Sequence, residues 1–240
     1  MNKPLLTLTF LLASTSSFAT VLVDEDFSHA DGALVGQSPA TGGTWTAHSG
    51  AGNKPVQVAS GQISLDQSSG SGEDINTSFM AMGSGDRIFA GFDLTLPSGQ
   101  TVNPDANGLY FAHFKDGGTS NFRARVFITA PSGGGDFGIG LDGNGSTPSV
   151  VWAGDLAFDT TYKVVVSYDY DSGDTELWVD PVDEMSTSIT DMAGTASTAI
   201  EAFALRQSND YTGSQVIDNL SISDVFSESL PVELMQFGVE

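Results

Sequence analysis

Apolar and polar residues alternate in short segments along most of this chain, and clusters of Gly, Ser, Thr and Asp separate the segments. Alternation with a period of two, interrupted by turn residues, is typical of antiparallel β-strands with one buried face. No segment of useful length shows the helical period. The pattern therefore predicts an all-β sandwich of two antiparallel sheets. The clearest strand faces are Ile88, Ala90, Phe92, Leu94 and Leu96, and Tyr162, Val164, Val166, Tyr168 and Tyr170.

The second of these strands is expected to form a hairpin. A turn of sequence DSGD at 171–174 separates YKVVVSYDY from TELWVD, and both flanking segments alternate as strands do. Within the first segment, Val165 faces away from Val164 and Val166. We expect the Val165 side of this sheet to be the more exposed one.

The chain begins like a bacterial secretory signal peptide over residues 1–19. Lys3 supplies the positive start, residues 5–12 are apolar, and residues 17–19 form a small-x-small cleavage site. We therefore expect a secreted, extracellular or cell-surface protein. No later segment reaches the roughly 20 apolar residues of a membrane helix, so membrane insertion is not expected. One β-sandwich domain is predicted over 20–224, followed by a C-terminal tail over 225–240 whose role stays open.

Charge and cysteine content exclude several kinds of chemistry. The formal net charge is −22, which disfavours nucleic acid and anionic lipid as partners. The chain contains no cysteine, which excludes disulfides, thiolate metal sites and cysteine nucleophiles. The acidity itself suits either a solvated surface or the binding of divalent cations.

Three segments carry a resemblance to a known superfamily. The hairpin YKVVVSYDYDSGDTELWVDP and the closing strand SQVIDNLSIS resemble the concanavalin A-like lectin and glucanase superfamily, including laminin-G-like modules. Segments such as YFAHFKDGGTSNFRARVF are similar to those of an exported bacterial subgroup. The resemblance spans about residues 21–223 and implies a jelly-roll β-sandwich with one concave sheet.

A calcium site is expected between the two ends of the chain. In many carbohydrate-binding β-sandwiches the first and last strands lie together, and acidic residues on them hold a structural Ca²⁺. Hard oxygen ligands are what Ca²⁺ takes. The candidate ligands are Asp24, Glu25, Asp26 and Asp218. The alternative is an acidic edge without a ligand, which discourages strand addition.

Positive charge is concentrated in one hairpin, HFKDGGTSNFRAR at 113–125. If paired residue numbers sum to an even value, odd residues of the two strands meet, and the even ones form the core. A bulge would break this arrangement. By the same alternation Ile128 belongs to the core. The residues expected on one shared face are His113, Lys115, Arg123 and Arg125, flanked by Phe111 and Phe127.

Such a face suits a sugar polymer. Aromatic rings stack on the C–H faces of pyranoses, and Arg pairs bidentately with carboxylate or sulfate. Trp45, Trp152 or Trp178 could add stacking surfaces. The alternative is a structural salt ladder to acids such as Asp93 or Asp169, which would need no ligand. We expect a non-catalytic module that binds an extracellular polysaccharide or cell-surface glycan, with a structural matrix or adhesion protein as an alternative.

Enzymatic activity is a further alternative. The Glu-x-Asp-x-Glu motif of the glucanases is absent, which argues against glycoside hydrolysis. A polysaccharide lyase acting by β-elimination would need Arg, Gln or His to neutralise a uronate carboxylate and a Tyr or His to move the proton. Tyr110 alternates onto the face opposite His113, which counts against this reading. Tyr168, Tyr170 or Tyr211 could complete the set only through tertiary contacts.

Overall fold

The computed structural model describes residues 19–68, 70–102, 109–208 and 213–231. Residues 1–18 of the expected signal peptide and 232–240 of the tail lie outside this part of the chain. Within the described ranges the chain forms strands β1–β16 and one short 3₁₀-helix, η1 (Phe226–Ser229). None of the helical structure described in these ranges has the length and apolar character needed to cross a membrane.

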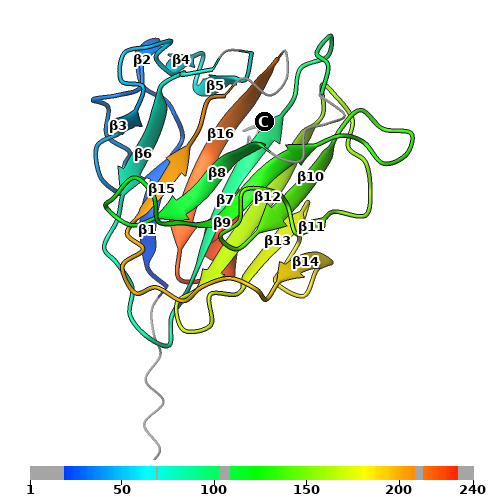
Figure 1. The fold of residues 1–240 in the computed structure, drawn as a ribbon. Helices are drawn as coiled ribbons and strands as arrows, with labels where there is room; N and C mark the ends of the chain where they lie inside the picture. Colours follow the sequence, from blue (N-terminus) through cyan, green and yellow to red (C-terminus); the bar gives the residue numbers. More distant parts are fainter. Residues whose placement is uncertain (1–18, 69, 103–108, 209–212, 232–240) are drawn as a thin grey trace, which may run out of the picture.

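Two antiparallel sheets stack face to face (Figure 1). The nine-stranded sheet runs β14 (Ser188–Asp191), β13 (Thr175–Val179), β12 (Thr161–Asp169), β7 (Arg87–Thr95), β16 (Ser214–Ser223), β5 (Gln62–Asp66), β4 (Gln57–Ala59) and β2 (Gly32–Ala33), with β1 (Val21–Glu25) also on β16. The seven-stranded sheet runs β11 (Val150–Val151), β10 (Gly138–Asp142), β9 (Phe122–Thr129), β8 (Leu109–Lys115), β15 (Ala202–Leu205), β6 (Asp74–Ser78) and β3 (Thr46–Ser49). The predicted all-β sandwich of two antiparallel sheets is therefore confirmed.

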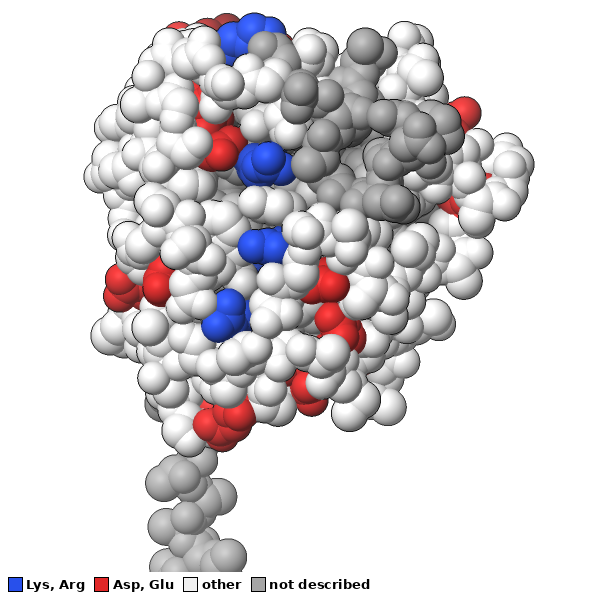
Figure 2. Space-filling model, viewed as in Figure 1, with Lys and Arg blue, Asp and Glu red and all other residues white. Residues whose placement is uncertain are grey.

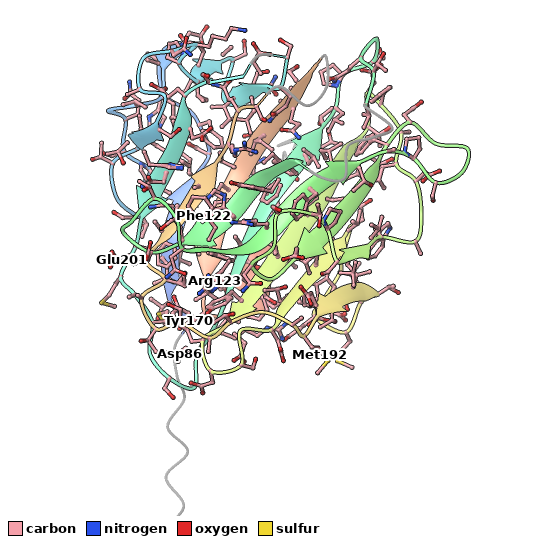
Figure 3. The ribbon with its side chains drawn as sticks, in the orientation of Figure 1. Asp86, Phe122, Arg123, Tyr170, Met192 and Glu201 are labelled. Carbon is pink, nitrogen blue, oxygen red and sulfur yellow. The ribbon has the colours of Figure 1, made fainter. Side chains whose placement is uncertain are left out.

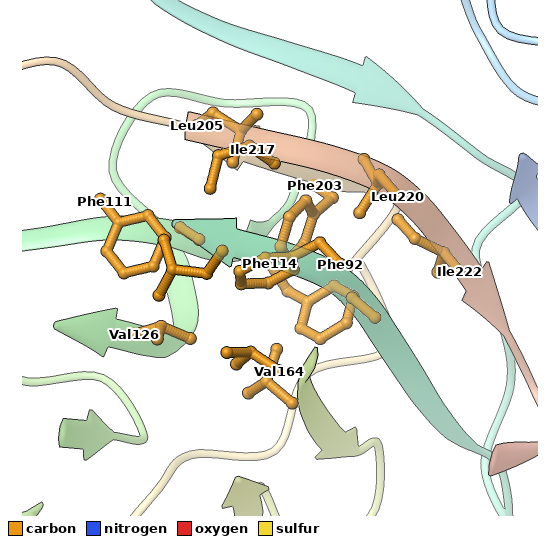
Figure 4. Close-up of a cluster of buried hydrophobic side chains, with 14 of the residues drawn as sticks. Phe92, Phe111, Phe114, Val126, Val164, Phe203, Leu205, Ile217, Leu220 and Ile222 are labelled. Carbon is orange, nitrogen blue, oxygen red and sulfur yellow. The ribbon is translucent and has the colours of Figure 1, made fainter. Parts of the chain in front are cut away.

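A single large core fills the space between the sheets (Figure 4). Phe92 on β7 packs against Phe111 on β8 and Phe203 on β15, with ring centroids 6.0 and 6.3 Å away. Each fully buried large apolar side chain stabilises the fold by about 1.5–3 kcal/mol relative to its exposed state. This aromatic contact joins the centres of the two sheets.

The two strand faces predicted from alternation lie where expected. Ile88 and Phe92 of β7 and Val164 and Val166 of β12 are all fully buried in this core. The hairpin of β12 and β13 also forms as predicted, with Val166 opposite Leu177. Ile128 of β9 joins the same core, 1% exposed, which confirms its predicted side.

The outer side of the nine-stranded sheet carries a second, smaller core. Val165 and Trp178 are fully buried there and contact Phe89 and Phe226. The prediction that Val165 lies on the more exposed side is therefore wrong. The reason lies in η1, which places Phe226 against Trp178 with ring centroids 5.0 Å apart. Alternation showed the two faces correctly, but it did not show that a distant segment covers the second one.

The C-terminal segment after β16 belongs to the packed structure as far as residue 231. A Cβ atom added to Gly91 of β7 would collide with the carbonyl oxygen of Ser229, so this segment lies directly on the sheet. Glycine permits that close approach because it has no side chain. Residues 225–231, predicted to be part of a tail, thus cover the outer core (Phe89, Val165, Trp178 and Phe226).

The first and last strands of the sandwich lie together, as expected. β1 pairs with β16, with Asp24 opposite Ser221 and Glu25 opposite Leu220. Asp26 therefore follows a strand that runs directly beside the one carrying Asp218.

Candidate functional site

The pairing of β8 with β9 decides which side chains share a face. Tyr110 pairs with Phe127 and Phe114 with Arg123, so the residue numbers sum to an odd value. The register shifts twice between these pairs, once on each strand, and Ala124 adopts a positive φ of 49° at the second shift. The predicted even register therefore holds only between the two shifts, where Ala112 pairs with Val126, and it is wrong for the rest of the hairpin because two β-bulges change the side on which residues point.

The bulges bring three rings together on the outer face of the seven-stranded sheet. The ring centroid of His113 lies 5.2 Å from that of Tyr110 and 4.2 Å from that of Phe122. Phe111, by contrast, points into the core against Phe92 and does not flank this face as predicted. Phe127 remains on the outer side, where its ring lies 5.9 Å from Tyr110, but it is fully buried.

Two guanidinium groups lie over the ring of Tyr110. The central carbon of Arg125 and that of Arg206 are each 4.6 Å from the Tyr110 ring centroid. Arg125 also lies 5.3 Å from the centroid of Phe122. Cations placed in this way are attracted to the negative face of an aromatic ring. Arg125 further donates hydrogen bonds to the carbonyl oxygens of Asn144 and Gly145, which fix its position.

His48 of β3 completes the group from the side. Its ring centroid lies 6.1 Å from His113 and 6.2 Å from Phe122. We call the set His48, Tyr110, His113, Phe122, Arg125 and Arg206 the basic–aromatic cluster. It is assembled from β3, β8, β9 and the end of β15, so distant parts of the sequence contribute to it.

Burial and neighbouring cations keep both histidines neutral. The pKa of His48 falls to about 4, because burial disfavours the charged ring and Lys115 and Arg206 repel a proton. The pKa of His113, which is fully buried, lies well below its usual value for the same reasons, with His48 and Arg125 among the repelling groups. Neither ring nitrogen of His113 has a hydrogen-bond partner among the described residues.

Arg123 does not join Arg125, although the sequence predicted one shared face. It is 9% exposed, and its Nε donates to the carbonyl oxygen of Thr195 at 2.7 Å. The hydroxyl of Tyr168, a core residue on the other sheet, donates to the same oxygen at 3.0 Å. Phe122 and Arg123 are consecutive on β9 (Figure 3), yet only Phe122 belongs to the basic–aromatic cluster. Arg123 thus holds the loop around Thr195 against the sandwich.

Lys115 ends β8 and is only 2% exposed. Its ammonium group donates to the carbonyl oxygen of Asp116 at 2.7 Å. Burial lowers the pKa of Lys115, while Asp116 and Glu201 raise it. Of the predicted residues, His113 thus belongs to the cluster and Lys115 lies close to it, but both are buried and do not form an exposed row.

The described residues show no salt ladder across this face. No carboxylate oxygen of these residues lies within 4.0 Å of the side-chain nitrogens of Lys115, Arg123, Arg125 or Arg206. Asp93 and Asp169, the predicted partners, lie on β7 and β12 of the other sheet. Figure 2 shows basic side chains down the middle of this face and acidic ones to either side. The alternative of a structural salt ladder is therefore wrong for the acids that were named.

Two of the three candidate stacking tryptophans are structural. Trp45 is fully buried, and its indole N–H donates to Glu25 at 2.7 Å. Trp178 is fully buried in the outer core of the nine-stranded sheet. Trp152 is half-buried and packs against the main core. None of the three stands in the basic–aromatic cluster.

The predicted calcium ligands do not all have carboxylates that are free to bind a cation. Oε1 of Glu25 accepts a hydrogen bond from the Phe27 amide, and Oε2 accepts one from the Trp45 indole and lies 3.1 Å from Nε2 of His29. It is thus occupied by structural contacts. Asp26 and Asp218 lie close enough that the charge of Asp26, with that of Asp93, raises the pKa of Asp218, although burial is the larger cause. The described residues contain no group of three or more side chains placed to hold a metal ion.

The tyrosines considered for a lyase lie in different parts of the molecule. The hydroxyls of Tyr168 and Tyr170 donate to the backbone carbonyls of Thr195 and Ile200, inside the sandwich. Tyr211 lies outside the described residues. Tyr110, which strict alternation placed opposite His113, is instead its neighbour.

Sequence reasoning missed four members of the cluster: His48, Tyr110, Phe122 and Arg206. Arg206 reaches the site because β15 pairs with β8, with Leu205 opposite Ala112. No local sequence pattern predicts that β15 pairs with β8. One signal was available, since Arg206 is one of only eight Lys and Arg residues in a chain with thirty acids.

Comparisons with known proteins agree on the fold. No protein-family model and no curated protein matches the sequence. Peanut lectin, solved with a 9mer peptide, is 14% identical with a TM-score of 0.52, over 86% of this chain and 97% of its own. Domain 4 of AbnA, a GH43 extracellular arabinanase from Geobacillus stearothermophilus, solved with arabinotriose, is 15% identical with a TM-score of 0.51, over 87% and 94%. The Emp47p carbohydrate recognition domain is 13% identical with a TM-score of 0.50, over 88% and 98%. The chain therefore has the concanavalin A-like jelly-roll fold that its sequence resembles.

Proposed function

We propose that this protein is an exported, non-catalytic module that binds acidic polysaccharide through the basic–aromatic cluster. The lectin-like fold supports a glycan as the partner, because the similar structures include lectins and a domain solved with arabinotriose. The fold alone does not choose the site or the glycan. That choice rests on the residues of the cluster.

The observation that carries the proposal is the pair of guanidinium groups over Tyr110. Arg125 and Arg206 each lie 4.6 Å from its ring centroid, and among the described residues neither has a carboxylate partner within 4.0 Å. Guanidinium groups grip carboxylate or sulfate through two parallel hydrogen bonds, and cation–π contacts with Tyr110 hold both of these groups near each other. A chain with thirty acids leaves these two arginines available.

The net charge of −22 does not oppose local binding of an anion. At physiological ionic strength charges are screened over about 8 Å, so a bound group feels mainly its nearest neighbours. Those neighbours are Arg125 and Arg206 of the cluster and the adjacent Lys115, all of which act on His113. We therefore expect binding to weaken as salt increases further.

A panel of immobilised polysaccharides tests the proposal. We expect uronate-rich and sulfated polymers such as alginate to retain the protein, and neutral polymers such as laminarin to retain it poorly. Equal retention on neutral polymers would contradict an anion-selective site. If the protein binds none of the polymers, the structural matrix or adhesion alternative is favoured.

One observation favours a second candidate function, a polysaccharide lyase. Tyr and His are the residue types that move the proton in β-elimination, and the ring centroids of Tyr110 and His113 lie 5.2 Å apart beside Arg125. In this reaction a base removes the proton next to the uronate carboxylate, a C=C bond forms, and the glycosidic C–O bond breaks. We favour binding because His113 is fully buried and both guanidiniums cover Tyr110. Release of unsaturated sugars that absorb in the near ultraviolet would reverse this preference.

A further inference from the structure

A hollow of about 400 Å³ lies beside the basic–aromatic cluster, over β3, β6, β8 and β15. Its lining includes Thr46, His48, Asn76, Lys115 and Glu201. We call it the Lys115 hollow. It reaches β3, the last strand of the seven-stranded sheet, so it opens toward the edge of that sheet.

Lys115 is a charged side chain built into the interior of this wall. It is 98% buried, as the complement of its 2% exposure, and still lines the hollow. The described residues give its ammonium group one hydrogen bond, to the carbonyl oxygen of Asp116. An ammonium group carries three donors, and its burial costs free energy that Asp116 and Glu201 offset only from beyond the 4.0 Å of an ion pair. Lys115 is thus prepared to meet an anionic group that enters the hollow.

His48 connects the hollow to the cluster. It lines the hollow, and its ring centroid is 6.1 Å from His113. Lys115 of β8 pairs directly with Phe122 of the cluster on β9. Lys115 therefore adjoins the cluster that contains Arg125 and Arg206.

We propose that the Lys115 hollow is a second anionic subsite, and that the ligand is an internal stretch of an acidic polymer and not a single terminal sugar. The inference rests on the proposed function. One acidic sugar contacts Arg125 and Arg206, and a further unit along the same chain places its carboxylate or sulfate against Lys115. Thr46, exposed on β3, stands where the polymer continues over the edge of the sheet.

Glu201 makes this inference testable by a gain of affinity. It is exposed, lines the hollow and carries a charge of the same sign as the ligand. If an anionic group enters the hollow, removal of the Glu201 charge should strengthen binding. If Lys115 only stabilises the fold, removal of that charge should leave binding unchanged.

The experiment compares short and long alginate oligosaccharides by isothermal titration calorimetry with the full chain. Lys115→Met removes the charge and keeps the aliphatic stem, and Thr46→Trp narrows the hollow while Lys115 keeps its charge. Lys54→Met is the matched control, because the ammonium group of Lys54 is already paired with Asp66 and does not line the hollow. We expect the first two variants to weaken hexasaccharide binding by about tenfold or more, the size of one charge-assisted hydrogen bond. Disaccharide binding and the control should change little, and Glu201→Gln should bind the hexasaccharide more tightly.

The outcomes separate this inference from the proposed function. If Arg125→Met abolishes binding but Lys115→Met and Thr46→Trp leave hexasaccharide affinity unchanged, the second subsite is wrong and the first stands. Equal losses for both oligosaccharides also overturn it, because the hollow would then not be a separate subsite. If the wild-type protein binds neither oligosaccharide, both proposals fall. Should Lys115→Met not fold, Thr46→Trp and Glu201→Gln still decide the result.

Discussion

The ring of Tyr110 meets the ring of His113 edge to face, with centroids 5.2 Å apart and planes at 89°. The contact exists because Tyr110 and His113, three residues apart on β8, both point to the outer face of the sheet. The ring of Tyr110 thereby links a buried, neutral imidazole to two guanidinium groups, each 4.6 Å from its centroid. These two groups are the ones that would hold the acidic substituent of a sugar.

Arg123 and Arg125 should behave differently although they carry the same charge two residues apart. Arg123→Met removes the bond to the Thr195 carbonyl and leaves that loop loose, so the free energy of unfolding should fall by about 1.5–3 kcal/mol. Arg125→Met removes the bonds to the Asn144 and Gly145 carbonyls, so it should lower stability by a similar amount, but it alone should also reduce alginate affinity. Urea unfolding and alginate titration of both variants measure the two effects. Loss of alginate binding in a folded Arg123→Met variant would contradict the inward position of Arg123.

The two histidines should make the fold sensitive to acid. Because the pKa of His48 is about 4 in the folded state and that of His113 is also depressed, the unfolded chain binds more protons below its histidine pKa of about 6.5. The histidine contribution to stability is therefore complete above that pH and is lost as the pH falls from about 6.5 toward 4. His113→Phe should lose less stability than the wild type over this interval. If the melting temperatures of the two proteins fall equally as the pH decreases over this interval, His113 is not buried and neutral.

An anionic ligand should reverse part of this effect. A carboxylate or sulfate near His48 favours its protonated form and so raises its pKa. Binding should then take up protons, and alginate affinity should increase as the pH decreases from neutral toward 5. Calorimetry in buffers of different ionisation enthalpy counts the protons taken up. Release of protons on binding would contradict the position of the ligand beside the histidines.

The segment 225–231 should be required for full stability. Phe226 is 5% exposed and packs against Trp178 and Phe89, so Phe226→Ala should reduce the free energy of unfolding by about 3 kcal/mol. A chain ending at residue 224 should melt lower still, because it exposes Val165 and Trp178 together. Ser227→Ala, an exposed position in the same segment, serves as the control. An unchanged melting temperature in the shortened chain would show that the segment does not stabilise the sheet.

The acidic residues near Asp218 give a prediction about calcium. Burial and the charges of Asp93 and Asp26 raise the pKa of Asp218, so stability is lost as the pH rises from the unfolded pKa of 3.8 through the higher folded pKa, and the loss is complete at neutral pH. In EDTA at neutral pH, Asp218→Asn should therefore raise the melting temperature, since the amide oxygen can still accept from the Asn219 N–H. If Asp26 and Asp218 bind Ca²⁺, added calcium should stabilise the wild type and not this variant. A lower melting temperature of Asp218→Asn in EDTA would contradict the repulsion.

Alternation predicted the sandwich because most strands place every second residue in one core. Phe92 and Val164 follow this rule, and their faces could be assigned from the sequence. Val165 follows the same rule, but its side of the sheet was predicted to be exposed. That side is buried because Phe226, which is distant in the sequence, packs on it. Local pattern shows which residues share a face and does not show what packs on that face.

The candidate site could be predicted only in part for a related reason. The sequence indicated the hairpin of β8 and β9 correctly, but two bulges moved Phe111 into the core and Arg123 away from Arg125. A bulge leaves no periodic signal, and Ala124 at φ 49° is not a residue type that announces one. Arg206 arrives through β15, a pairing between strands far apart in the sequence.

The most direct test of the proposed function is the affinity of alginate for a double variant of the two arginines over Tyr110. Arg125→Met combined with Arg206→Met is compared with the wild type by calorimetry, and Lys54→Met combined with Lys163→Met removes the same charge elsewhere. Melting curves confirm that all three proteins are folded. The account predicts that the first double variant loses affinity by about a hundredfold or more, the amount expected for two charge-assisted contacts, while the control binds like the wild type. Equal losses in both double variants, or undiminished binding without Arg125 and Arg206, would contradict it.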